Sequence, residues 1–310
     1  MYSQGVGILC ALERKRLELE DTNQEFIVRH INKIYERLGI SFNQFVDSQV
    51  RAIEETKVKI NKRKGVIGFI KVFPNFSVIV ENMLPPADGP ERLETRAMVD
   101  EAYNKIIRSM FDSLKTIAKA APVSGPGLTA DPEDKEALNY HILLIENMFH
   151  FYNELDEHGD PVLGQWRGKA VMEMSEHQEL YVNAIIRRPL GKLLDFLDSA
   201  ENLIGRGVAP SSIPSTHPSH SRSVYKKILS SYDAKEVRRG IETLKKRIEK
   251  HFGEADDMAI STELIKRINA ECERKYNDVQ ERATRIAGEM FEGTVQVEFA
   301  KQDVSQAFRR

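Results

Sequence analysis

The residues of this chain best spaced to bind a metal ion are Glu146, His150, Glu154 and His158, which recur at intervals of four. On one α-helix this spacing places two imidazoles and two carboxylates on the same face, so they could converge on a cation. Each helical turn rises by about 5.4 Å, and only neighbouring pairs can reach one ion. A complete site needs ligands from a second helix, and no other pattern signals them. The spacing therefore favours an ordinary solvated helix face.

A second candidate is the stretch Gly164–Lys169, which superficially resembles a phosphate-binding loop. It has three residues between its glycines where the Walker motif has four, and Ala170 stands where that motif places a magnesium-binding hydroxyl. The patterns GxGxxG, GxSxG and HExxH do not occur in the sequence. The carboxylates lie among basic residues at helical spacing, so no acid–base couple stands out. These observations predict a protein that is not an enzyme and that uses no cofactor and no small-molecule substrate.

The remaining candidate is a basic amphipathic helix between residues 235 and 250, where seven basic and three acidic side chains accompany an apolar stripe. Such a helix can contact anionic lipid or an acidic partner. The pattern also arises where the stripe faces a bundle core and the basic face is merely solvated, and this interpretation is favoured. A basic run at residues 57–64 raises the same question. The residues predicted as possible lipid or partner contacts are Lys235, Arg238, Arg239, Lys245, Lys246, Arg247 and Lys250.

Length and composition bound the kind of protein that carries these residues. The 310 residues suffice for two or three cores, and 45 basic residues balance 47 acidic ones. This balance indicates helices with mixed-sign solvent faces and argues against a nucleic-acid partner. Cys10 and Cys272 lie at opposite ends of the chain, and neither belongs to a CxxC pair, which favours a reducing compartment. We expect no membrane span, and the first residues suggest a piece of a longer protein.

Helical periodicity dominates the sequence. Capping boxes at Thr22–Glu25 and Ser41–Gln44 predict two helix starts, and Asp233 with Glu236 predicts a third. A helix beginning near Trp166 is expected to run to about residue 204, with a kink or a division at Pro189. Residues 294–299 alone alternate like a strand. Residues 205–223 hold three prolines and six serines, which predicts a mobile loop with little buried surface.

The predicted fold class is therefore all-α, with helical bundles in tandem. The breaks in the sequence divide the chain into a first helical bundle at 1–121, a middle helical segment at 122–204, a flexible loop at 205–223 and a C-terminal helical bundle at 224–310.

Several stretches, spread in order over most of the chain, resemble the C-terminal region of the Sec-three family of exocyst subunits, also called exocyst complex component one. The longest runs from a helix through a Lys/Arg cluster and a Gly-Val-Ile break into a Phe-Ile-x-x-Phe-Pro-x-Phe pattern. The stretches are FVDSQVRAIEETKVKINKRKGVIGFIKVFPNFSVIVENM (45–83), AYNKIIRSMFDSL (102–114), YVNAIIRRPLGKLLDFLDSAENLI (181–204), SYDAKEVRRGIETLKKRIEKHF (231–252) and VQVEFAKQDV (295–304).

The resemblance implies a non-enzymatic scaffold fragment of the exocyst, the assembly that tethers secretory vesicles to the plasma membrane before fusion. It implies an elongated rod of bundles, other exocyst subunits as partners, and a cytoplasmic location with recruitment to plasma-membrane sites of secretion. In this family, phosphoinositide and GTPase binding belong to an N-terminal domain, and a coiled coil pairs the subunits; neither region is resembled here.

Two alternatives come from other classes of protein. The first is a peripheral membrane-binding module that uses residues 235–250 on anionic phosphoinositide membrane. The second is a metal-dependent helical enzyme that uses His150 and His158.

Overall fold

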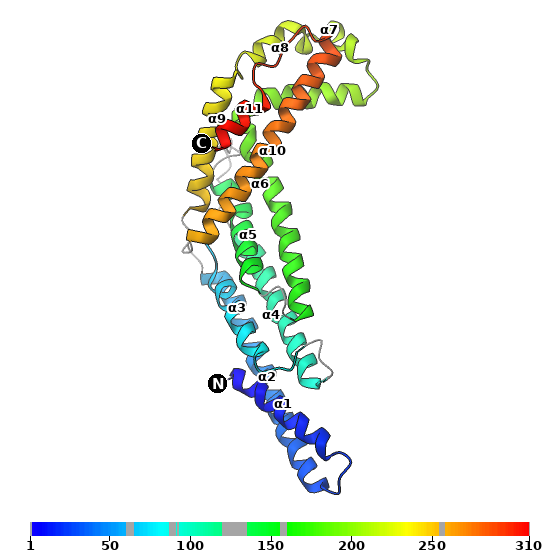
Figure 1. Cartoon of the computed structure of the whole chain (residues 1–310), viewed down its shortest axis with the longest axis vertical. Coiled ribbons are helices and arrows are strands. Elements are labelled where there is room, and N and C mark those ends of the chain that lie inside the picture. The colour runs from blue at the N-terminus through cyan, green and yellow to red at the C-terminus, as the bar shows by residue number, and fades with distance from the viewer. Residues whose placement is uncertain are drawn as a thin grey trace. The chain divides into compact units, whose positions relative to one another are not determined.

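The computed structural model describes residues 2–59, 65–86, 91, 93–119, 135–155, 160–253 and 258–309. These residues are almost entirely helical and contain no β-strand, which confirms the all-α prediction (Figure 1). Residues 294–299 lack the predicted strand, although Val295 and Phe299 are both buried. The long helices are α1 (Tyr2–Leu19), α2 (Glu25–Lys59), α3 (Gly68–Glu81), α4 (Glu94–Lys119), α5 (Lys135–Glu154), α6 (Pro161–Gly205), α9 (Ala234–Phe252) and α10 (Met258–Phe291). The short ones are η1 (Pro210–Ser212), α7 (Ile213–Thr216), η2 (Pro218–His220), α8 (Arg222–Leu229) and α11 (Lys301–Arg309).

The chain folds as two compact units. Unit 1 comprises residues 1–125 and 139–177, and unit 2 comprises residues 126–138 and 178–310. Helix α6 therefore contributes its first turns to unit 1 and its remainder to unit 2. The division at 1–121, 122–204 and 224–310 stays a prediction.

The core of unit 1 is a chain of aromatic rings from four helices. Phe73 of α3 lies edge-on to Tyr103 of α4 at 5.9 Å and stacks near Phe151 of α5 at 6.1 Å. Phe111 of α4 meets Phe151 at 5.2 Å and Trp166 of α6 at 5.3 Å, both edge-on. Edge-to-face and offset pairs at these separations stabilise a core beyond the area they bury. Trp166, which is 8% exposed, is thus part of this core.

A buried carboxylate joins α1 to the start of α4. Glu13 is only 2% exposed, and its side chain accepts the backbone N–H groups of Glu94 and Thr95, the latter at 3.0 Å. It also accepts the Thr95 hydroxyl at 2.7 Å. The first N–H groups of a helix have no partner inside the helix, so Glu13 caps α4 from another element.

A second buried network surrounds Arg96. Its guanidinium contacts Glu81 at the end of α3 at 2.8 Å and Asp160 before α6 at 3.2 Å. It also donates to the carbonyl of Pro85 at 2.6 Å. The Tyr103 hydroxyl donates to Glu81 at 2.9 Å. One half-buried cation thus ties α3, the loop after it and the start of α6 to α4.

Helix α6 begins earlier than predicted and is not divided. It starts at Pro161, and Asp160 accepts the N–H of Val162 at 2.7 Å, which is the usual arrangement of a capping Asp followed by Pro. The sequence had placed this start near Trp166. Pro189 lies inside the helix, yet the helix continues to Gly205.

In unit 2, α9, α10 and α11 pack on one another, as Figure 1 shows. A stack of rings lies beneath the short helices: Phe196 of α6 faces Tyr225 of α8 at 4.6 Å, and Tyr225 faces Phe291 of α10 at 5.4 Å. The Tyr225 hydroxyl donates to the carbonyl of Ala283 at 2.8 Å, so this buried polar group is satisfied.

Residues 205–223 contain short helical elements, and the flexible loop predicted there stays a prediction. They form two short 3₁₀ turns, α7 and the start of α8, with Ile213 completely buried and His220 only 5% exposed. His220 packs against Phe196 at 5.0 Å. Ile213 and His220 are the only buried residues of this segment, so its composition gives little sign of the helical turns.

Two of the three predicted capping boxes are wrong. The Thr22 hydroxyl donates back to the carbonyl of Leu19, and α2 starts only at Glu25. Ser41 lies inside α2 and bonds the carbonyl of Arg37, four residues earlier, at 3.1 Å. The third is confirmed, since Asp233 accepts the N–H of Glu236 at 2.7 Å.

Replacement of Glu13 should destabilise unit 1. In Glu13→Ala, two N–H groups and a buried hydroxyl lose their acceptor, and we expect a loss of about 2–3 kcal/mol in the free energy of unfolding. Thermal or denaturant unfolding measures this. Glu18→Ala removes an exposed carboxylate from the same helix and should change stability by less than about 0.5 kcal/mol. Equal effects of the two changes would contradict the capping role.

The stability of unit 1 should also depend on Asp100. Burial, more than the nearby Asp160 charge, raises the pKa of Asp100 from 3.8 to about 6, although Arg96 opposes the shift and Glu81 adds to it. The folded state holds this proton more tightly than the unfolded chain does. The contribution of Asp100 to stability is thus complete below pH 3.8 and is lost as the pH rises through 6.

We therefore expect Asp100→Asn to raise the melting temperature at pH 7, with a gain that shrinks as the pH falls to about 4.5. The exposed Asp112→Asn on the same helix serves as the control. A gain that does not change with pH would contradict the assignment.

Candidate functional site

The structure describes three of the four residues predicted as metal-like. Glu146, His150 and Glu154 lie on α5, and Glu146 is buried in unit 1, whereas His158 lies outside the described residues. Within the described part of the chain, no group of three or more His, Cys, Asp or Glu is placed to hold a metal ion. The loop-like stretch 164–169 is helical and belongs to α6. The two cysteines are buried and unpaired.

The basic helix of the prediction is α9. Asp233 caps its start, and its apolar stripe is buried against α10 and α11, as the favoured interpretation expected. The buried side chains are Val237, Ile241, Leu244, Ile248, His251 and Phe252. The stripe is therefore part of the core of unit 2 and is not available to a bilayer.

The seven basic residues of α9 do not form one surface. Lys235, Arg239, Lys246 and Lys250 are exposed, whereas the other three are half-buried at the flanks of the helix. Of the half-buried residues, Lys245 donates to the carbonyl of Phe308 in α11 at 3.0 Å.

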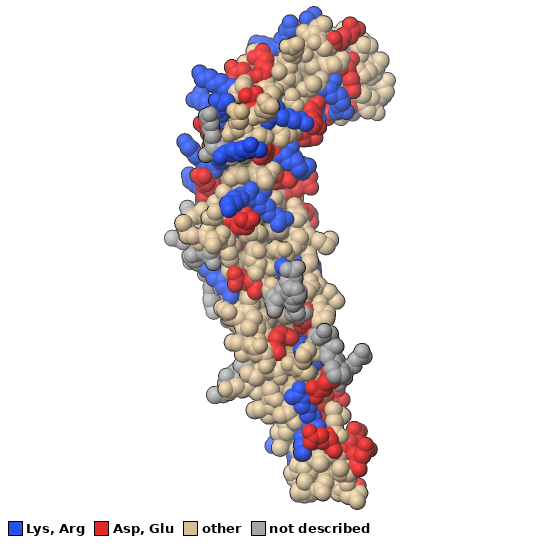
Figure 2. Space-filling model, in the orientation of Figure 1, with Lys and Arg blue, Asp and Glu red and all other residues tan. Residues whose placement is uncertain are grey.

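Acidic side chains interrupt the exposed basic face. Glu242 and Glu249 are exposed and lie three or four residues from Lys246, which places them on the same side of the helix. Glu236 is 4.0 Å from Arg239. Figure 2 shows the same mixture, with Asp and Glu side chains interspersed among the Lys and Arg side chains over this unit. The face carries a small net positive charge and no continuous basic patch. The second basic run, at residues 57–64, lies largely outside the described residues.

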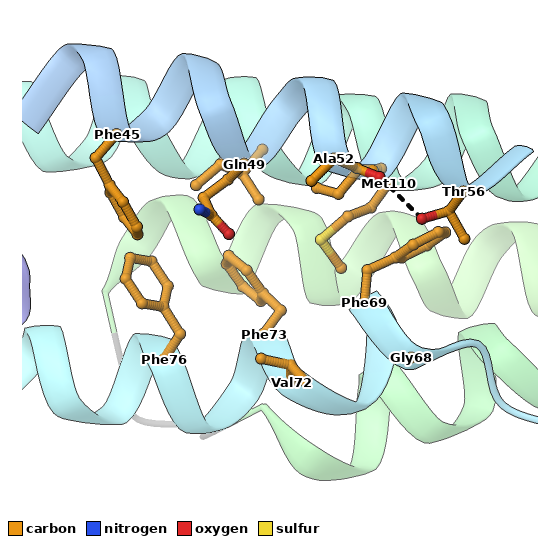
Figure 3. A pocket seen from close by; sticks show the side chains of 12 residues that line it. Phe45, Gln49, Ala52, Thr56, Gly68, Phe69, Val72, Phe73, Phe76 and Met110 are labelled. Carbon is orange, nitrogen blue, oxygen red and sulfur yellow. Dashed lines mark hydrogen bonds between the residues drawn. The ribbon is translucent and has the colours of Figure 1, made fainter.

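An open apolar groove lies in unit 1 between α2 and α3, with α4 as its floor (Figure 3). Its volume is about 260 Å³. Phe45 of α2 and Phe76 of α3 face each other across it, with ring centres 6.1 Å apart. Ile106 and Met110 of α4 close the bottom and are almost fully buried. Gln49 and Thr56 supply polar side chains in the wall. Nothing in this lining is chemically reactive.

Helix α3 is apolar nearly all round. One face is buried and includes Ile70, Phe73 and Val80. A second stripe follows the groove side at spacings of three and four: Phe69 and Phe76 are half-buried, Val72 is 64% exposed, and Ile79 is 48% exposed. A helix that is apolar all round is normally covered on all sides. The second face of α3 thus has the composition of a contact surface.

The sequence interpretation missed this stripe. The signal was present in GFIKVFPNFSVIVE (68–81), where only Lys71, Asn75, Ser77 and Glu81 are polar. A surface helix of a bundle needs one apolar stripe, and this segment carries two.

These features define the class of protein. The described residues form helical units whose concave surfaces suit packing against other helices, and within those residues no helix is long and apolar enough to cross a bilayer. A model of the family "Exocyst complex component Sec3, C-terminal" matches residues 2–293. The chain belongs to this family.

Relatives with this region occur in animals and plants. The chain is 24% identical over 218 residues to Exocyst complex component 1 of Mus musculus, and the matched region is 70% of this chain and 22% of the relative. It is 24% identical over 275 residues to the Drosophila melanogaster protein of that name, and the matched region is 86% of this chain and 27% of the relative. The chain is 22% identical over 268 residues to Exocyst complex component SEC3A of Arabidopsis thaliana, and the matched region is 86% of this chain and 26% of the relative.

The chain thus spans about a quarter of the length of these curated relatives. No solved structure matches it.

Proposed function

We propose that this chain is a non-enzymatic scaffold within the exocyst, and that it supports vesicle tethering in exocytosis through contacts with other exocyst subunits. Membership of the Sec3 C-terminal family supports this role. The names of the relatives describe components of a complex, which is consistent with a protein that acts by binding. The proposed location is the cytoplasm, with recruitment to plasma-membrane sites of secretion. The rod of successive bundles stays a prediction from the resemblance.

The single observation that carries the proposal is the second apolar stripe of α3. Val72 and Ile79 are large apolar side chains that face solvent beside an apolar groove. Exposed, contiguous apolar surface of this kind marks a binding site in a soluble protein. The groove is open along α3, which suits an amphipathic helix whose side chains recur at three- and four-residue spacing. The proposed occupant is therefore an amphipathic helix of another exocyst subunit.

The double change Val72→Ser and Ile79→Ser tests this role. Both side chains are largely exposed, so unit 1 should keep its stability while the contact surface becomes polar. Loss of two apolar contacts at an interface should weaken association with the other exocyst subunits by about tenfold or more. The measurement is reconstitution of the complex from co-expressed subunits, with the changes placed in the full-length subunit.

The control is Met172→Ser, which removes another large apolar side chain from the surface of unit 1. Met172 is 74% exposed on α6 and does not line the groove. It should assemble like the unchanged protein. Normal assembly of the Val72/Ile79 variant, at equal melting temperature, would refute the docking role of α3.

The alternative is that the exposed basic residues of α9 contact anionic phosphoinositide membrane. Four exposed cations support it: Lys235, Arg239, Lys246 and Lys250. The acidic residues on the same face weaken it, because they repel the lipid surface. Each basic residue near an anionic surface contributes only about 1 kcal/mol.

Vesicle flotation separates the two roles. We expect phosphoinositide vesicles to retain the chain weakly at low salt and not at about 0.15 M, where the Debye length is about 8 Å. Retention at 0.15 M salt that is lost when Lys235, Lys246 and Lys250 become Gln would favour the membrane role.

A further inference from the structure

Two histidines of unit 1 face each other across two helices. His141 of α5 and His177 of α6 are in hydrogen-bonding contact, with their Nδ1 atoms 3.2 Å apart. Their ring centres are 5.2 Å apart, and the ring planes are tilted by 45°. His177 is only 9% exposed, and His141 is half-buried. This histidine pair therefore joins α5 to α6 through a polar contact that water reaches poorly.

Aromatic packing surrounds the histidine pair. The ring of Tyr140 lies edge-on to His177 at 5.3 Å and edge-on to His141 at 5.4 Å. Aromatic rings in this arrangement exclude water and offer no strong hydrogen bond to an imidazole nitrogen. The hydrogen bond within the pair is thus not easily replaced by another one.

The contact requires exactly one hydrogen between the two facing nitrogens. One Nδ1 must carry a hydrogen and donate it, and the other must be unprotonated and accept it. Two neutral imidazoles of opposite tautomers meet this condition, and so does a pair that has gained one proton. A pair that has gained two protons does not, because two N–H groups then face each other and two positive charges lie close together.

The surroundings make protonation of the pair unfavourable. Burial is the main influence on the pKa of both imidazoles and lowers it from 6.5. The carboxylates of Glu176 and Glu173 on α6 oppose this and raise the pKa of His177. Lys115 of α4 lowers the same pKa, although its ammonium also pairs with Glu173 at 2.8 Å. A charge on His177 lowers the pKa of His141, whereas Glu176 raises it.

We propose that the histidine pair is a pH-sensitive contact, which holds α5 to α6 near neutral pH and breaks in acid when both rings carry protons. The proposal goes beyond the scaffold function and does not depend on which partner the chain binds.

The sign of the pH dependence follows from the two states of the chain. The imidazoles of the unfolded chain take up protons near pH 6.5, whereas the folded pair takes them up only at lower pH. The stability that the pair provides is therefore complete above pH 6.5 and is lost as the pH falls through the lower pKa values of the folded pair. This is opposite to the dependence expected for Asp100, whose contribution is lost as the pH rises.

The test compares the melting temperature of the full 310-residue chain with that of His177→Asn. The side-chain amide of Asn places a nitrogen or an oxygen where histidine has Nδ1, so it can face His141 as donor or acceptor without titrating. Between about pH 7.5 and about pH 5.5, we expect the unchanged chain to lose at least about 3 °C more than the variant does. An equal loss in both proteins would overturn the pH sensitivity of the pair.

The matched control is His30→Asn, which removes an exposed imidazole from α2 of the same unit. The Nδ1 of His30 donates to the carbonyl of Phe26 at 2.8 Å. This variant should show the same acid-induced loss as the unchanged chain, to within about 1 °C. Asp100 is unaltered in all three proteins, so its opposite contribution cancels in the comparison.

Nuclear magnetic resonance of the chain labelled with ¹⁵N in its histidines gives a second measurement, which needs no variant to be stable in acid. At neutral pH we expect one ring of the pair to carry its hydrogen on Nδ1 and the other on Nε2. Both rings should titrate at a lower pH than His30 does. The same tautomer in both rings, or titration of His177 at or above the pH at which His30 titrates, would overturn the proposal.

Discussion

The half-buried guanidinium of Arg96 is the interaction on which the arrangement of unit 1 depends. It holds Glu81 at the end of α3 and Asp160 at the start of α6, so both helices take their places relative to α4. A charge so far removed from water is tolerated because carboxylates and a carbonyl surround it. The groove follows from this, since α3 can lie opposite α2 only while its far end is fixed. Glu13 acts in the same way at the other side of α4, where it ties α1 to the bundle.

The way the chain uses its charges explains why it resembles a scaffold more than a binder of lipid or nucleic acid. Many cations are already engaged within the protein: Arg282 forms ion pairs with Asp198 and Glu201 at 2.6 Å, and Lys115 pairs with Glu173 at 2.8 Å. Cations that stabilise the fold in this way contribute little to a long-range field. The apolar stripe of α3 in unit 1, by contrast, is not engaged in this way and faces solvent at Val72 and Ile79.

The helices could be predicted from the sequence, because each apolar stripe repeats over many turns and one misleading position does not change the prediction for the whole helix. The sequence was also sufficient for the cap at Asp233, where the signal is local. The prediction of helix starts failed where the same local pattern occurs both at a helix cap and inside a helix. Ser41 has the spacing of a cap but bonds backwards inside α2, because the apolar stripe of that helix continues past it. The Asp160–Pro161 start was available from the same rule and was overlooked. The packing of α6 on α9 could not be predicted, because it depends on a close approach at Gly240, where an added Cβ would lie 3.3 Å from Cβ of Pro189.

The second apolar stripe of α3 would affect how the cell treats a chain that has not assembled with partners. Before assembly, Val72 and Ile79 face water, and such surface is what chaperones and degradation systems recognise on incomplete proteins. A copy made in excess of its partners would therefore be an orphan that is held or removed, whereas an assembled copy would be protected. The residues proposed as the docking surface would then also adjust the abundance of the chain to that of its proposed partners.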